Sequence, residues 1–211
     1  MTIIQTQLIL FTAAVAGGMA VFLIPLNQVK LLKLFLSFSG AYILAVSTLH
    51  LFPEVYEKGG SFVGIYILIG FILQVIFEQF SRGIEHGHMH VHNHAGLPFW
   101  IMFSLCFHAF LEGMPLGSAD RHVHSSSDTL LYGITFHKIP EAFALISVLS
   151  GHHLKRKTVF LFLFLFSIMS PLGTWFSSVF ENTVLRGVLD SEKILALVLG
   201  LLLHISTTIL F

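Results

Sequence analysis

The sequence predicts an all-α integral membrane protein, a polytopic bundle of transmembrane helices. Hydrophobic residues make up 55% of its 211 residues and charged residues only 10%, whereas a soluble domain carries about 25% charged residues. The mean hydropathy is +0.85, and the apolar residues gather in runs of about 20, the length of a membrane-spanning helix. A formal net charge of +0 argues against a nucleic-acid partner. The bilayer is therefore the expected environment.

Seven segments are long and apolar enough to span a bilayer, and together they form a single transmembrane domain over residues 1–211. They are residues 3–26, 31–52, 61–80, 98–118, 129–150, 158–180 and 192–211. Polar or glycine-rich connections separate them in order: NQVK, PEVYEKGG, a histidine-rich stretch over 82–97, ADRHVHSSSD, GHHLKRK and ENTVLRGVLDS. Short connections favour antiparallel neighbours in one bundle.

The two ends of the chain carry separate expectations. The first segment is interpreted as a retained span, because it lacks a basic start and exceeds the apolar core of about 7–15 residues found in signal peptides. The last segment ends LLLHISTTILF without a polar flank. We therefore expect the natural chain to continue beyond residue 211.

The distribution of basic residues predicts that the amino terminus lies outside, because Lys and Arg favour cytoplasmic loops. In that orientation six of them face the cytoplasm and four face outside. The six are Lys30, Lys33, Arg82, Lys155, Arg156 and Lys157, and the four are Lys58, Arg121, Arg186 and Lys193. No organelle address is visible, so the expected location is a bacterial cytoplasmic membrane.

Two apolar segments carry the same polar pair. FHAFLEGMPLG holds His108 and Glu112, and FHKIPEAFAL holds His137 and Glu141. Positions i and i+4 share one face of a helix, and both pairs fall near the middle of a span. An ionised carboxylate there costs at least about 2.5 kcal/mol. Hydrogen bonding between helices is one explanation, but two matching pairs favour a divalent ion of the zinc, iron or manganese type held by all four side chains.

Further polar residues surround this candidate centre. Lys138 is predicted to stand as a fixed positive charge beside the two carboxylates, which suits one bound ion rather than two. His50 and Glu54, in LHLFPE, repeat the i, i+4 spacing at an outer helix end and are expected to line the path by which metal reaches the centre. An ordinary polar helix end is the alternative. His204 is expected to hydrogen-bond between helices rather than to bind metal.

The stretch over 82–97 is predicted to be a cytoplasmic metal-capturing loop. Histidines occupy every second position, and such tracts bind metal by composition. They are His86, His88, His90, His92 and His94. The glycines around them predict a flexible loop, so weak capture of metal is expected rather than a rigid site.

The paired motifs resemble the fourth and fifth transmembrane helices of the ZIP family of Zrt- and Irt-like divalent metal transporters. LHLFPE resembles the end of that family's second helix, the histidine-rich stretch its loop between helices three and four, and SPLG at 170–173 its sixth-helix signature. The resemblance implies eight helices, of which seven are visible here. It also implies a metal site at His108, Glu112, His137 and Glu141, and an elevator-like or rocking cycle that imports the ion.

Three positions depart from the family members that carry a two-metal centre. Those members have Asn or Asp after the fourth-helix His, an acidic or amide residue after the fifth-helix His, and Glu before the sixth-helix Pro. This chain has Ala109, Lys138 and Ser170 there. The resemblance therefore implies a single-ion centre in which Lys138 replaces the second metal.

These observations predict a transporter of divalent transition metals, with Zn²⁺ as the first candidate for the transported substrate and iron, manganese and cadmium as further candidates. A membrane-embedded zinc hydrolase with seven helices is the alternative from another class. A catalytic zinc keeps one coordination position open and has a general base nearby. The hydrolase is disfavoured because the four candidate ligands here form two equivalent pairs, with no further acidic residue at that depth. A metal sensor or scaffold and a homodimeric assembly both stay open at this point.

Overall fold

The computed structural model describes residues 1–23, 29–58, 60, 62–81, 97–117, 126–152, 154–180 and 190–210. Within these ranges the regular structure is entirely helical, which confirms the predicted all-α class. The helices are α1 (Ile3–Ala20), α2 (Val29–Val46), α3 (Phe52–Lys58), α4 (Val63–Ser81), α5 (Leu97–Gly113), α6 (Ser126–Gly151), α7 (Arg156–Phe180) and α8 (Ser191–Leu210). A π-helical turn, Ser47–Leu51, joins α2 to α3, and a 3₁₀ turn, Met114–Gly117, follows α5.

Six of the described helical segments are long and apolar enough to cross a membrane. The predicted span 31–52 is longer than expected, because the π-helical turn continues it into α3 as one stretch over Leu32–Lys58. The predicted span 129–150 is also helical, within the 26 residues of α6. It is more polar than the other six, since His137, Lys138 and Glu141 all lie in it.

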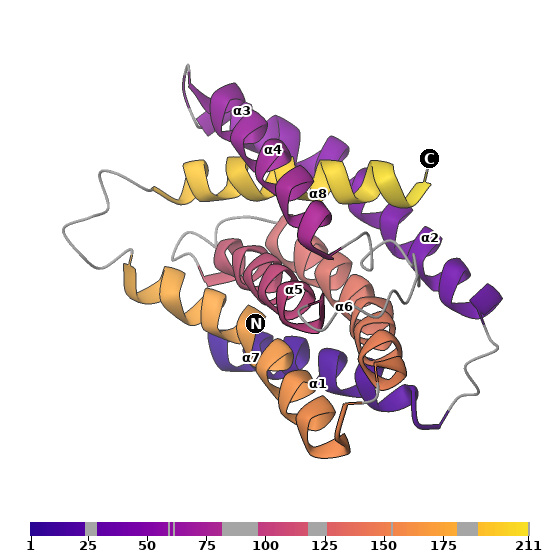
Figure 1. Cartoon of the computed structure of the whole chain (residues 1–211). Coiled ribbons are helices and arrows are strands. Elements are labelled where there is room, and N and C mark those ends of the chain that lie inside the picture. The colour runs from indigo at the N-terminus through magenta and orange to yellow at the C-terminus, as the bar shows by residue number, and fades with distance from the viewer. Residues whose placement is uncertain are drawn as a thin grey trace.

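The helices pack as two groups that meet at α5 and α6. In one group α1 packs against α6 and α7, and α5 packs against α7; in the other, α8 packs against α2 and α4. Contacts of α2 with α6 and of α4 with α5 join the groups. Figure 1 shows α5 and α6 in the middle of the molecule, with α4 and α8 on one side and α1 and α7 on the other. The two helices that carry the paired motifs are thus the central ones.

Glycines allow the closest of these helix contacts. A Cβ atom on Gly70 would collide with the carbonyl oxygen of Leu197, and one on Gly200 with that of Ile67, so α4 and α8 lie backbone against backbone. Small residues are the usual means of close packing in membranes, where lipid removes the hydrophobic drive for helix association. The backbones of α4 and α8 are therefore in direct contact.

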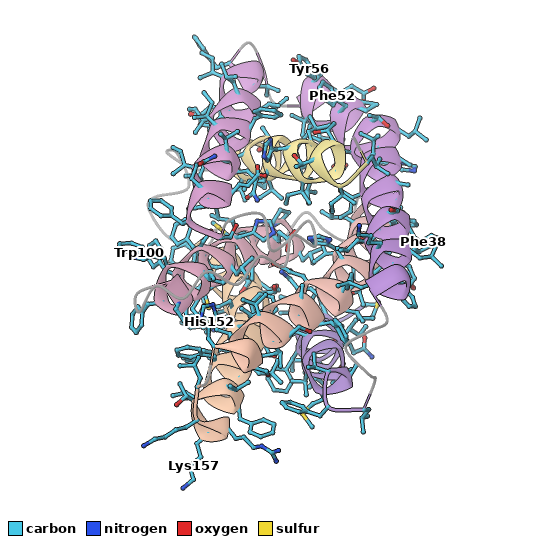
Figure 2. All side chains as sticks on the ribbon, turned by 45° about the vertical axis from the view of Figure 1, so that its right-hand side comes forward. Phe38, Phe52, Tyr56, Trp100, His152 and Lys157 are labelled. Atoms are coloured by element: carbon cyan, nitrogen blue, oxygen red, sulfur yellow. The ribbon has the colours of Figure 1, made fainter. Side chains whose placement is uncertain are left out.

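Large apolar side chains cover the outside of the bundle. Phe38, Trp100 and Phe103 each expose about half of their surface, 54%, 55% and 54% respectively. Figure 2 shows Phe38 and Trp100 pointing outward at opposite edges of the view. A soluble protein rarely exposes large contiguous apolar areas, so this surface is suited to lipid, and the molecule is an integral membrane protein.

Candidate metal centre

The four side chains of the paired motifs meet in the core between α5 and α6. His108, Glu112, His137 and Glu141 expose 1%, 0%, 0% and 0% of their surface. Along α5, His108 Nε2 lies 3.0 Å from Glu112 Oε1; across to α6 it lies 3.9 Å from Glu141 Oε1. The i, i+4 spacing accounts for the first contact, and the placement of the two helices for the second.

The spacing of the ligand atoms fits a metal ion with small side-chain movements. One ligand atom each from His108, His137 and Glu141 lies within 4.8 Å of the others. Bonds of about 2.0–2.2 Å to a tetrahedral ion set its ligand atoms about 3.3–3.6 Å apart. Closing this set therefore takes a contraction of about 1 Å. Glu112 adjoins it through the 3.0 Å approach to His108.

Several buried atoms of these four residues have no hydrogen-bond partner among the described residues. They include both ring nitrogens of His137, Nε2 of His108, Oε1 of Glu141 and Oε1 of Glu112. The 3.0 Å approach of His108 to Glu112 is close enough for an ion pair but lacks hydrogen-bond alignment. Buried polar groups are nearly always bonded, so this set of nitrogen and oxygen atoms suits a cation.

Lys138 lies between the two carboxylates. Its Nζ is 2.7 Å from Glu112 Oε2 and 2.7 Å from Glu141 Oε2, and it lies 5.0 Å from the centre of the Phe166 ring. The lysine is only 1% exposed. One oxygen of each glutamate therefore faces the ammonium, while the other, Oε1, faces the histidines.

Gln74 is a member of this cluster that the sequence reasoning missed. It lies on α4, is fully buried, and its Oε1 is 3.0 Å from His108 Nδ1. The available signal was a single amide in the apolar run ILQVIF. Glu78, one turn further along α4, was also missed, and its Oε2 lies 2.7 Å from His204 Nε2 on α8. The prediction that His204 forms a bond between helices is confirmed.

The positions that depart from two-metal ZIP proteins also lie beside this centre. Ser170 Oγ donates a hydrogen bond of 2.9 Å to the carbonyl oxygen of Ala109, which joins α7 to α5.

Pro140, inside α6, has no N–H to donate to the carbonyl oxygen of Phe136. This weakens the backbone of α6 next to His137.

The predicted outer and loop sites are separate from this centre. His50 lies in the π-helical turn and is exposed, whereas Glu54 is partly buried and pairs with Lys58 at 3.3 Å. These two residues are therefore not brought together with the four central side chains. The predicted loop residues His86, His88, His90, His92 and His94 lie outside the described residues.

A bundle of apolar helices around buried histidines and glutamates defines a polytopic membrane protein with a candidate metal centre. The family described as ZIP Zinc transporter matches residues 85–211, more than half of the sequence. The chain belongs to the ZIP zinc transporter family. Proteins of this family are transporters rather than enzymes.

Individual relatives agree with the family match. The chain is 27% identical over 138 residues to protein zntD of Dictyostelium discoideum, an alignment that covers 59% of this chain and 20% of the relative. It is 27% identical over 119 residues to zinc transporter ZIP9-B of Xenopus laevis, covering 53% of this chain and 38% of the relative. The chain thus aligns with less than half of each relative's length, and both relatives are eukaryotic.

Proposed function

We propose that this protein carries a divalent transition-metal ion, zinc first, across the membrane into the cytoplasm through a single-metal site formed by His108, Glu112, His137 and Glu141. The observation that supports this most is the convergence of two carboxylates and two imidazoles at full burial with unsatisfied atoms facing one another. The similarity to zinc transporter ZIP9-B and the family match support zinc as the substrate. Iron, manganese and cadmium use the same ligand types.

The cluster's geometry accounts for both binding and release. Two carboxylates supply negative charge and two imidazoles supply nitrogen ligands, a combination that holds zinc firmly. Within the described residues α5 and α6 are not among the closely packed helix pairs, so the four side chains bridge two helices whose separation is the proposed releasing step. Separation would divide the ligand set into two weaker pairs and free the ion.

The finer features of the transport path are part of the same proposal. The amino terminus lies outside, the ion arrives past His50 and Glu54, and it leaves toward the loop with His86, His88, His90, His92 and His94. Lys138 replaces a second ion. The KRK cluster at 155–157 supports this orientation, and Figure 2 shows Lys157 at the end of the molecule opposite Phe52 and Tyr56.

Zinc uptake into proteoliposomes tests the proposal. The full chain should accumulate radioactive zinc, and His108→Ala or Glu141→Ala should each abolish uptake, because each removes a ligand. His152 directly follows α6 and lies outside the cluster, so His152→Ala should retain uptake. Deletion of residues 86–94 should leave most of the uptake. Equal loss in the loop deletion and the ligand variants would show that the transport site lies elsewhere.

A further inference from the structure

We propose that Gln74 is a positioning residue of the metal centre, which holds His108 with its proton on Nδ1 and presents Nε2 to the metal as an unprotonated ligand. The inference deepens the proposed function and rests on it for its consequence, because only a bound metal makes use of a free Nε2. It adds a third helix, α4, to a site otherwise formed by α5 and α6.

The contact between Gln74 and His108 is the basis for assigning the tautomer. Gln74 Oε1 lies 3.0 Å from His108 Nδ1, and both residues are buried. An amide oxygen only accepts hydrogen bonds, so we assign the proton to Nδ1, which donates it to Gln74 Oε1. In a neutral imidazole the other nitrogen then has a free lone pair.

The free lone pair is directed at the carboxylates. His108 Nε2 lies 3.0 Å from Glu112 Oε1 and 3.9 Å from Glu141 Oε1, and an ionised carboxylate only accepts. In this tautomer Nε2 and the two carboxylate oxygens direct lone pairs toward the same space, and none of the three atoms has an aligned hydrogen bond among the described residues. A divalent cation placed among them turns this repulsion into coordination.

Gln74 lies on a helix that packs closely against α8. Gly70, one turn earlier, lets α4 lie directly against the Leu197 carbonyl of α8. Gln74 thus belongs to the α2, α4 and α8 group, whereas His108 belongs to the other. A metal-ligating histidine commonly has such a partner on its second nitrogen, and loss of the partner lowers metal affinity by about 10–100-fold.

Zinc affinity of the purified full chain in detergent gives the first test. Gln74→Met, close in size but without an acceptor, should weaken zinc binding by about 10–100-fold. Gln74→Glu keeps an acceptor for Nδ1–H and should bind zinc at least as tightly as wild type. Ser104→Ala is the matched control, because Ser104 Oγ donates a 2.7 Å bond to the Phe77 carbonyl across the same α4–α5 contact without touching His108. It should leave affinity unchanged.

The order of these variants separates positioning from packing. A purely structural role would make Glu the worse replacement, since a carboxylate costs more in an apolar interior than a thioether does. Weaker zinc binding in Gln74→Glu than in Gln74→Met, or an equal loss in Ser104→Ala, would overturn the proposal.

The tautomer can be read directly without metal. In protein labelled with nitrogen-15 at histidine, the His108 signals, identified by their loss in His108→Ala, should show the proton on Nδ1 in the wild type. Gln74→Met should lose this signature and Gln74→Glu should keep it. Any other protonation pattern in the metal-free wild type would refute the role of Gln74. A wild type with the expected tautomer but no saturable zinc binding would instead refute the proposed function.

Discussion

Replacing Lys138 with methionine tests the charge arrangement of the centre most directly. The ammonium lies 2.7 Å from one oxygen of Glu112 and 2.7 Å from one of Glu141, in a site with essentially no solvent exposure. Methionine has a similar length and no charge. The Lys138→Met variant therefore leaves the two carboxylates facing each other without a cation.

The magnitude follows from these distances. At an effective dielectric constant of about 20, each 2.7 Å contact corresponds to about 6 kcal/mol of Coulomb energy. Desolvation of the ammonium offsets much of this, and measured losses on removing one partner of a buried ion pair are about 3–5 kcal/mol. We expect Lys138→Met to lower the free energy of unfolding of the metal-free protein by that amount.

Zinc should reverse the loss. With Lys138 present, the two glutamates and the lysine carry one net negative charge when empty and one net positive charge when a dication is bound. Without it, the empty site carries two negative charges and the loaded site none. Zinc should therefore bind Lys138→Met at least about tenfold more tightly, equivalent to about 1.4 kcal/mol, and transport should slow because release is harder.

The assay is unfolding in detergent with and without zinc, followed by uptake into proteoliposomes. Lys193→Met is the matched control, since Lys193 pairs with Asp190 at 2.9 Å in a partly exposed position, where ion pairs contribute little. It should change neither stability nor affinity. A Lys138→Met protein as stable as wild type without metal, or one that binds zinc more weakly, would refute the reasoning.

Three further predictions concern packing, the second polar pair and orientation. Gly200→Val should destabilise the fold by about 1–3 kcal/mol, because the valine side chain would meet the Ile67 carbonyl. Gly64→Ala should be tolerated, because the nearest neighbour of the added methyl group is Tyr56 Oη at 3.5 Å. Thermal unfolding in detergent measures both variants, and equal stability of the two would contradict the packing. His204→Leu should lower the free energy of unfolding by about 0.6–2 kcal/mol, because it removes the 2.7 Å bond to Glu78. A double-mutant cycle with Glu78→Leu should give a coupling energy of that size. Additive effects of the two substitutions would show that the bond contributes nothing. In a Cys106→Ser background, which removes the single native cysteine, Glu57→Cys should react with an impermeant thiol reagent added outside cells and Lys157→Cys should not; the reverse pattern would invert the proposed orientation.

The central cluster was predictable because its determinants are local. The spacing of His108 with Glu112 and of His137 with Glu141 fixes each pair on one helical face. The cost of a carboxylate deep in an apolar helix then requires that the two faces meet a common compensating charge. Both conditions can be read along the chain, and the structure places these residues together.

The role of Gln74 was not predictable in this way. Gln74 and His108 are 34 residues apart, and which face of α4 meets α5 depends on how the two helix groups pack. A glutamine in an apolar run indicates a polar contact but not its partner. Only the three-dimensional arrangement shows that the partner is the second nitrogen of a candidate metal ligand.

The outer site shows a different limit. The expectation for His50 and Glu54 assumed an α-helical period, but the chain forms a π-helical turn over Ser47–Leu51. A π-helix has more residues per turn than an α-helix, so the direction of the side chains beyond this turn could not be read from an α-helical period. His50 is exposed, while Glu54 is partly buried and pairs with Lys58.

The positions around Lys138 give a physical reason for proposing a single ion. A second dication would need oxygen ligands beside the first, but Ala109 offers only a methyl group there, and the hydroxyl of Ser170 already donates to the Ala109 carbonyl. The remaining position is filled by an ammonium that occupies one oxygen of each glutamate. The ammonium is part of the protein, so its positive charge remains in the site after a metal ion leaves. The empty centre then carries one net negative charge instead of two, which lowers the cost of releasing the ion.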